Sequence, residues 1–169
     1  EPASIDILSV SVIPRLATYA DVTAGVTSEN RDGIRYRTLY THAPGRIEYP
    51  VRIPDGGQLD LGLGVVMGGV PVTFRVTATN GNAPGETLLE ETYADATKFA
   101  TRSIDLSHLS GRAVTLALEA ESESEGTIAL WATPTVSGKV TASKPNIIFY
   151  VIDGAGADFM SVYGYNRRT

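Results

Sequence analysis

The stretch VTFRVTAT, from Val72 to Thr79, decides the fold class because apolar and polar side chains alternate along it. Such alternation places one face of an extended strand against a core and the other face in solvent. Residues 114–119, VTLALE, alternate in the same way, with Val114, Leu116 and Leu118 on one face. Strands of this kind are typical of antiparallel sheets, so the two stretches predict an antiparallel β-fold.

Residues 34–140 continue this pattern as short apolar-polar runs separated by Gly, Pro and Asn. Helical periodicity is scarce there, and short strands between regular turn signals are typical of a sandwich or barrel. We therefore expect a mainly β protein whose strands form a jelly-roll β-sandwich. The expected strands are residues 34–40, 46–53, 58–66, 72–79, 86–93, 99–105, 114–121 and 127–136.

Three segments of this region resemble parts of known β-sandwich modules, and they occur in the expected order. Residues 38–65, TLYTHAPGRIEYPVRIPDGGQLDLGLGV, resemble the opening strands of modules that precede certain bacterial sulfatase domains. Residues 103–114, SIDLSHLSGRAV, resemble a segment of galactose-binding-like jelly rolls in which Leu106 and Leu109 anchor a short turn. The segment LWATPTV, which contains Trp131, is similar to the strand that closes such domains. The resemblance implies a galactose-binding-like fold, and many such folds bind sugars.

Sugar sites need exposed aromatic side chains beside polar groups, but most aromatic residues here lie in predicted strands. Their alternation places several of them toward the core, and we interpret them mainly as packing residues. For Trp131 we favour packing over a ligand platform, because it lies in an apolar strand rather than in a loop. The strand aromatics are Tyr36, Tyr40, Tyr49, Phe74, Tyr93, Phe99 and Trp131.

Four arginines give the first two predicted strands a basic character. Guanidinium groups pair with anions in a bidentate way, so these arginines could contact an acidic or sulfated glycan. Their alternate spacing also describes the solvent face of an ordinary sheet, and this is the interpretation that we favour. The four residues are Arg35, Arg37, Arg46 and Arg52.

The only histidines, His42 and His108, fall near predicted turns. Neither has Cys, Asp or Glu at metal-ligand spacing, so we interpret both as polar surface residues. The chain contains no Cys, which excludes disulfides and thiol chemistry.

Residues 144–169, KPNIIFYVIDGAGADFMSVYGYNRRT, have a different pattern. Residues 147–152 form a continuous apolar run, which is typical of a strand buried on both faces of a parallel sheet. Asp153 ends this run and precedes small residues that allow a sharp turn. A carboxylate at the carboxyl end of such a strand suits a hard divalent cation, although Asp153 could equally cap the next helix or face solvent.

The order of this stretch resembles the amino-terminal motif of the sulfatase family, in the alkaline phosphatase superfamily. The resemblance implies that Asp153 is a metal ligand, usually of calcium, and that the parent protein hydrolyses sulfuric esters. Gly154 stands where many sulfatases have a second Asp, and the nucleophile segment and the other metal ligands are missing. We therefore expect no catalytic residue in this chain, which by itself would be an inactive fragment.

These patterns predict three parts: an N-terminal extension over residues 1–33 that could add an edge strand, a β-sandwich over 34–140, and the truncated start of a sulfatase-like catalytic domain over 141–169. Within the extension, residues 5–12 read as a strand. Our leading hypothesis is a noncatalytic module of a sulfatase-like hydrolase, with a sulfated or other carbohydrate as the substrate of the parent protein. The alternatives are a stand-alone carbohydrate-binding module and the N-terminal part of a related phosphodiesterase or phosphotransferase.

The net charge of −5 and the pI near 5.0 argue against a nucleic-acid partner. No apolar run is long enough to cross a membrane, since a span needs roughly 18 or more such residues. The family resemblance implies a periplasmic or extracellular, bacterial-type location. We expect the apolar strand at residues 146–152 to pack against the sandwich, to pair with a second copy of the chain, or to be disordered.

Overall fold

The computed structural model describes residues 18–19, 22–81, 84–139 and 166. The chain divides into two compact units, Glu1–Lys139 and Val140–Thr169, and the described strands all belong to the first. Asp153, the apolar run 147–152 and the strand expected at residues 5–12 lie outside the described residues, and the predictions on them stay predictions.

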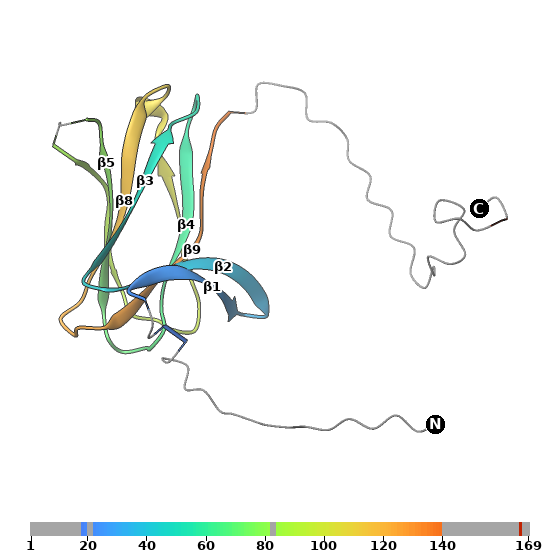
Figure 1. The fold of residues 1–169 in the computed structure, drawn as a ribbon, viewed down its shortest axis with the longest axis vertical. Coiled ribbons are helices and arrows are strands. Elements are labelled where there is room, and N and C mark those ends of the chain that lie inside the picture. Colours follow the sequence, from blue (N-terminus) through green and yellow to red (C-terminus); the bar gives the residue numbers. More distant parts are fainter. Residues whose placement is uncertain (1–17, 20–21, 82–83, 140–165, 167–169) are drawn as a thin grey trace. The chain divides into compact units, whose positions relative to one another are not determined.

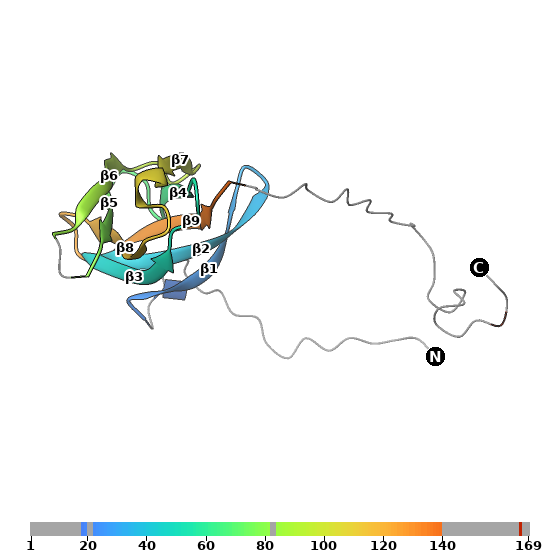
Figure 2. The same ribbon diagram turned by 90° about the horizontal axis from the view of Figure 1, so that it is seen from above.

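The strands form two antiparallel sheets that face each other (Figures 1 and 2). The five-stranded sheet has the order β1-β2-β9-β4-β7, and the four-stranded sheet has the order β3-β8-β5-β6. Consecutive strands repeatedly cross from one sheet to the other, which is the connectivity of a jelly roll. The strands are β1 (Ala24–Arg31), β2 (Ile34–Ala43), β3 (Gly45–Arg52), β4 (Gln58–Val65), β5 (Val72–Thr79), β6 (Glu86–Tyr93), β7 (Ala100–Asp105), β8 (Ala113–Glu121) and β9 (Thr127–Ser137).

All eight strands expected from the sequence are present, with bounds that differ by at most a few residues. The strand β1 is not among them: it lies in the expected N-terminal extension, is an edge strand of the five-stranded sheet, and pairs with β2 along its whole length, so the sandwich begins before residue 34. Asp32 and Gly33 join the two strands, and both have positive φ, at 52° and 76°. This is the backbone of a type I′ hairpin turn, so the Asp-Gly pair was an available signal for β1.

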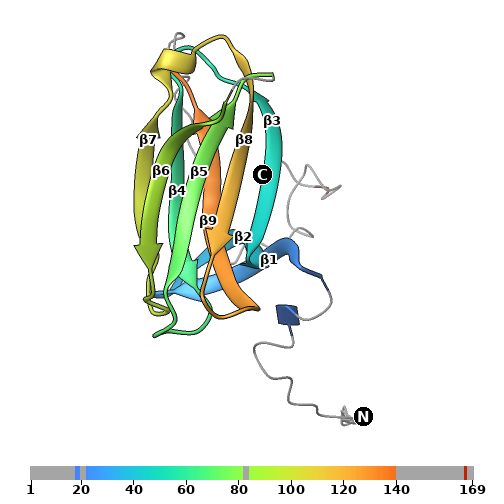
Figure 3. The ribbon, with the colours of Figure 1, turned by 90° about the vertical axis from the view of Figure 1, so that its left-hand side faces the viewer.

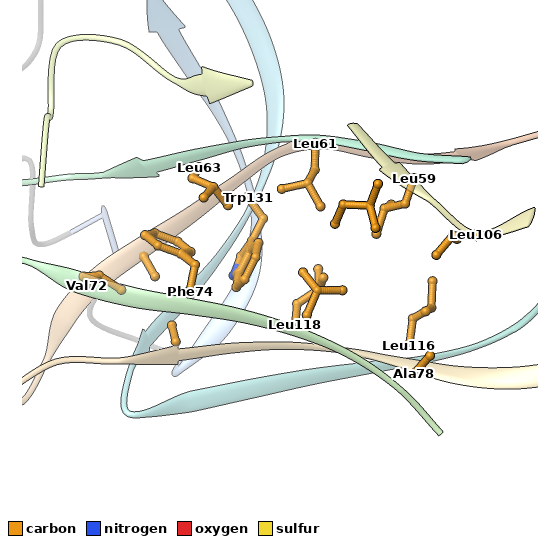
Figure 4. Packing of buried hydrophobic residues seen from close by; sticks show 14 of the residues in the cluster. Leu59, Leu61, Leu63, Val72, Phe74, Ala78, Leu106, Leu116, Leu118 and Trp131 are labelled. Carbon is orange, nitrogen blue, oxygen red and sulfur yellow. The ribbon is translucent and has the colours of Figure 1, made fainter. Parts of the chain in front are cut away.

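The core between the sheets is built by the alternating faces that the sequence predicts. The burial of β5 alternates residue by residue, and Val72, Phe74 and Val76 are fully buried. Trp131 of β9 is also fully buried, and its ring meets that of Phe74 edge-to-face at 4.9 Å (Figure 4). The interpretation of Trp131 as a packing residue is therefore confirmed.

The short turn expected between β7 and β8 is a 3-10 helix, η2 (Ser107–Leu109). Leu106 and Leu109 are both buried in the main core cluster, which confirms that they anchor this turn. The backbone N–H of Leu106 donates to the carbonyl of Gly57 at 2.9 Å, so the same turn ties the 54–57 loop to the sandwich.

A row of alternating charges crosses the outer face of the four-stranded sheet, which faces the viewer in Figure 3. In this row Arg46 lies opposite Glu119, Glu119 opposite Arg75, and Arg75 opposite Glu90. Arg46 and Glu119 form an ion pair, and Arg75 Nε donates to Glu90 at 2.8 Å. A slip of any strand by one residue would put these side chains on the core face, so the row helps to fix the register.

The β1–β2 hairpin covers part of the outer face of the five-stranded sheet. Tyr36 of β2 meets Phe99 edge-to-face at 5.0 Å, and the guanidinium of Arg31 lies 5.5 Å from the Phe99 ring centre. Phe99 in turn lies against β4, where a Cβ added at Gly64 would be 2.6 Å from its ring. The glycine therefore makes room for the ring, and the ring anchors the hairpin.

A buried ion pair holds the same hairpin. Glu29 and Arg31 are each 7% exposed, and Arg31 Nη1 lies 3.2 Å from Glu29 Oε2. Tyr19 donates to Glu29, and Arg31 also donates to the carbonyl of Val65 at 3.3 Å. A buried pair of this kind needs such additional hydrogen bonds to offset its desolvation. Here they join the hairpin to the end of β4 at Val65 and to Tyr19, which precedes β1.

We predict that Phe74→Ala lowers the free energy of unfolding by about 3–5 kcal/mol, because it leaves a cavity beside Trp131. The matched control is Met67→Ala, since Met67 is 52% exposed and its truncation should change stability by no more than about 0.5 kcal/mol. Urea unfolding followed by tryptophan fluorescence checks both. Equal stabilities for the two variants would contradict the described core.

Candidate functional site

The two sheets meet along two sides of the sandwich, and one of these sides is closed while the other is open. On one side Arg102 of β7 and Glu91 of β6 form a bidentate pair, with Arg102 Nε donating to Glu91 Oε2 at 2.6 Å. Tyr93 donates to the carbonyl of Lys98 at 3.1 Å on the same side. On this side the edge strands β6 and β7 lie next to each other (Figure 2), and the ion pair connects them.

On the other side the sandwich is open. β2 pairs with β9 only from Thr38, which lies opposite Ala132, to Ala43. Beyond Ala132, β9 continues along β4 to Ser137, while the first half of β2 follows the hairpin away. β3 is the facing edge of the four-stranded sheet and pairs only with β8. The separation of β2 from β9 therefore leaves a gap between two strand edges.

This gap forms a groove with a volume of about 660 Å³, which we call the side groove. Core leucines line it together with residues of β3, of the β1–β2 hairpin and of the last part of β9. The lining residues are Val26, Arg37, Thr38, Leu39, Tyr49, Pro50, Val51, Leu59, Leu116, Leu118, Thr133, Pro134, Thr135 and Val136.

A β-bulge shapes the β9 wall of the side groove. The register between β4 and β9 shifts between Asp60 and Gly62, so that Thr133 and Pro134 oppose the single residue Leu61. The bulge reverses the alternation, because Trp131 points into the core before it and Val136 packs against the core after it. Thr133 has a φ of 43°, an unusual conformation for a β-branched residue. Such strained residues are common at functional sites.

Tyr49 is the exposed aromatic residue of the side groove, and 45% of its surface is accessible. The expectation that strand aromatics are core residues is correct for Tyr40, Phe74 and Trp131, which are buried. It is wrong for Tyr49. β3 is an edge strand, and its burial pattern shows three consecutive exposed residues at Glu48, Tyr49 and Pro50, so strict alternation does not hold there.

Among the residues that the structure describes, Arg37 is the one charged side chain in the lining of the side groove. It lies opposite Ser28 of β1, at the point where β2 has left β9. Among the described residues it has no ion-pair partner, whereas Arg46 is held by Glu48 and Glu119. The interpretation of the four arginines as part of an ordinary solvent-facing sheet surface therefore fits Arg46. It does not fit Arg37, which lines the side groove.

The two histidines differ from each other. His108 is exposed and lies 3.0 Å from Glu86, so its interpretation as a polar surface residue is confirmed. The same interpretation of His42 is wrong, because His42 lies within β2, is partly buried, and donates through Nε2 to the carbonyl of Tyr19 at 2.7 Å. Its role is to hold the chain before β1 against β2. No cluster of metal-binding side chains occurs among the described residues.

A polar cluster lies beside the β9 wall, on strand β4, which pairs with β9, and on strand β7, which pairs with the other edge of β4. Asp60 lies opposite Thr135 of β9 and Ser103 of β7. Ser103 donates to Asp60 at 2.6 Å and Gln58 donates to it at 2.9 Å. These two hydrogen bonds lower the pKa of the Asp60 carboxyl from its usual value of 3.8, and the bond from Ser103 has the larger effect. The cluster gives the outer surface next to the groove a fixed negative charge.

Comparison with known proteins places the chain in a class of fold. No family model and no curated protein matches the sequence. The fold is similar to that of TmCBM61, solved in complex with β-1,4-galactotriose, with a TM-score of 0.50 and 7% identity over 71% of this chain and 85% of that one. The CBM22-1 xylan-binding domain from Paenibacillus barcinonensis gives a TM-score of 0.43 and 17% identity, over 67% of this chain and 80% of that one.

The similarity to TmCBM61 confirms the predicted fold class, a galactose-binding-like β-sandwich of two antiparallel sheets such as carbohydrate-binding modules have. The similarity to TmCBM61 concerns the β-sandwich and gives no support for a sulfatase domain. In the part of the chain that the structure describes, no helix is long and apolar enough to span a membrane.

We predict that Thr133→Gly raises the free energy of unfolding by about 1 kcal/mol, because glycine adopts a positive φ without the steric cost paid by threonine. Thr135→Gly is the matched control in the same wall. Thr135 lacks the positive φ, so glycine should lower stability there by about 0.5–1 kcal/mol. Chemical unfolding compares the two, and a loss of stability in both variants would argue against the bulge.

The lowered pKa of Asp60 makes stability depend on pH with a defined sign. Its ionised form is favoured in the folded state, so the contribution is present above pH 3.8 and is lost as the pH falls through the lower folded value. We predict that Asp60→Asn is less stable than the wild type at about pH 5 and that the difference shrinks toward about pH 2. Urea midpoints over this range test it.

Ser103→Ala is the control for this pH dependence, because it removes the hydrogen bond that lowers the pKa most. In that variant the stability difference caused by Asp60→Asn should be smaller. A difference that is independent of pH would show that the charge of Asp60 does not contribute.

Proposed function

We propose that the chain is a carbohydrate-binding module and that the side groove is its binding site. The observation that carries this proposal is the exposed ring of Tyr49 at the mouth of a preformed groove whose opposite wall offers Arg37 and threonine hydroxyls. Ligand sites in proteins combine such a concave, largely apolar surface with a few polar groups that fix orientation. The fold supports the proposal, since TmCBM61 was solved with a bound galactotriose.

Each part of the groove has a role in this proposal. The Tyr49 ring presents an apolar face to the C–H face of a sugar ring, and its hydroxyl remains available to water or ligand. Thr133 and Thr135 are exposed on the β9 wall. The Thr133 hydroxyl can donate to and accept from sugar hydroxyls, whereas the Thr135 hydroxyl donates to the carbonyl of Thr133 at 2.9 Å and can accept from a sugar. Leu116 and Leu118 provide an apolar floor that belongs to the rigid core. The site is therefore held in place before a ligand binds.

The other outer surfaces offer less to a sugar. The outer face of the four-stranded sheet is occupied by the charge row of Arg46, Glu119, Arg75 and Glu90, whose groups already bind each other. On the five-stranded sheet, Phe99 is covered by Tyr36 and Arg31. The side groove differs from these two outer faces because the ring of Tyr49 is accessible there.

A second candidate function rests on sequence alone. The motif in residues 144–169 resembles the start of a sulfatase domain, which would make this sandwich the noncatalytic module of a sulfatase-like hydrolase or of a related phosphodiesterase or phosphotransferase. In that case Asp153 would bind calcium in the parent protein, and the module would guide a carbohydrate substrate. A periplasmic or extracellular location belongs to the same proposal. Extending the coding sequence beyond Thr169 and measuring sulfate release from a sulfated glycan tests it.

We predict that Tyr49→Ala weakens glycan binding at least about tenfold, because aromatic residues in such sites contribute much of the binding energy. Retardation of the protein in native gels that contain galactan, xylan, pectin, polygalacturonate, carrageenan or desulfated carrageenan measures binding. Tyr49→Phe should retain most of it, since the ring is kept.

The control is Ile34→Ala, because Ile34 is 55% exposed but does not line the groove. This variant should bind like the wild type. Retardation by none of the six polysaccharides, or equal retardation of the wild type and Tyr49→Ala, would overturn the proposed function.

A further inference from the structure

We propose that the glycan bound by the side groove is acidic and that Arg37 is the residue that selects it. This inference rests on the proposed function, which says only that a glycan binds there. The chemical class is a glycan that carries anionic groups, either the carboxylates of uronic acids or sulfate esters.

The charge of the side groove favours an anionic ligand. The whole chain has a net charge of −5, yet the groove is lined by one arginine and by no Asp, Glu or Lys among the described residues. The Tyr49 phenol and the threonine hydroxyls are neutral, and the Asp60 carboxylate, which lies opposite Thr135, belongs to the outer surface beside the groove and not to its lining. A guanidinium without a carboxylate partner, in a groove whose other lining residues are neutral, attracts a negatively charged ligand.

The guanidinium of Arg37 is available to bind a ligand. Four other arginines of the sandwich already have carboxylate partners: Arg31 with Glu29, Arg46 with Glu48 and Glu119, Arg75 with Glu90, and Arg102 with Glu91. Arg37 has no such partner within the described part of the chain. Its guanidinium therefore retains donors that can bind a carboxylate or sulfate in a bidentate way.

The position of Arg37 also allows it to contact a ligand in the side groove. Arg37 lies on β2 just beyond the last residue that pairs with β9, so no strand covers that edge of its backbone. Its neighbour on β1 is Ser28, a small neutral residue. On the facing wall Tyr49 contributes the aromatic ring. A sugar seated against Tyr49 would thus expose a ring substituent to the guanidinium across the groove.

The test compares each acidic polysaccharide with its neutral counterpart. The probes are oligogalacturonate against its methyl ester, and carrageenan oligosaccharides against their desulfated form, each titrated into the full chain by calorimetry. We expect at least one acidic probe to bind more tightly than its neutral partner, and more weakly when the salt rises from about 50 to about 500 mM. The galacturonate and carrageenan arms distinguish a carboxylate from a sulfate.

The variant is Arg37→Gln, which keeps the length and polarity of the side chain but removes its charge. We expect its affinity for the preferred acidic probe to fall about 10- to 100-fold, the range of a charge-assisted hydrogen bond, while the affinity for the neutral partner falls much less. Arg35→Gln is the matched control, because Arg35 is exposed on the same strand but does not line the groove. It should bind like the wild type.

The outcomes separate this inference from the proposed function. If both members of each pair bind equally and Tyr49→Ala still weakens binding, the groove binds neutral glycans and the inference on Arg37 is wrong. If Arg35→Gln weakens binding as much as Arg37→Gln, the preference comes from general surface charge, and the assignment to Arg37 is overturned. If no probe binds, the inference and the proposed function both fail.

Discussion

The structure depends on one constraint, which is that β9 must pair with two neighbours whose paths separate. β2 follows β9 only as far as Thr38, while β4 follows it to Ser137. The hairpin that carries β2 away is held to the outer face of the sheet by Phe99 and by the buried pair of Glu29 and Arg31. The contacts that hold the hairpin on the outer face take the first half of β2 away from β9, and this separation leaves the side groove. The bulge at Thr133 lies where β9 continues past the gap.

The groove and the core are parts of the same structure. Leu116 and Leu118 belong to the main core cluster and also line the side groove, so the surface proposed to bind a glycan is built on buried core residues. On the opposite side of the sandwich, the pair of Arg102 and Glu91 closes the equivalent gap. The sandwich therefore has one side closed by an ion pair and one side that carries a groove.

Much of the fold could be predicted because strand alternation is a local property. Val72, Phe74 and Val76 reveal their strand and its buried face without any knowledge of their partners. The site could not be predicted in this way. The exposure of Tyr49 depends on β3 lying at a sheet edge, and the position of Arg37 depends on where β2 leaves β9; both are properties of pairing between distant segments. Only the Asp32-Gly33 turn was a local signal that was missed.

The most direct test of this account is to map the binding surface by ¹⁵N–¹H NMR during titration with a glycan that binds. The account predicts that the amide shifts of Thr38, Val51 and Thr135 change, since these residues line the side groove. It also predicts that the amides of Arg75 and Glu90, on the outer face of the four-stranded sheet, stay unchanged. Shift changes centred on Arg75 and Glu90, with the groove unaffected, would contradict it.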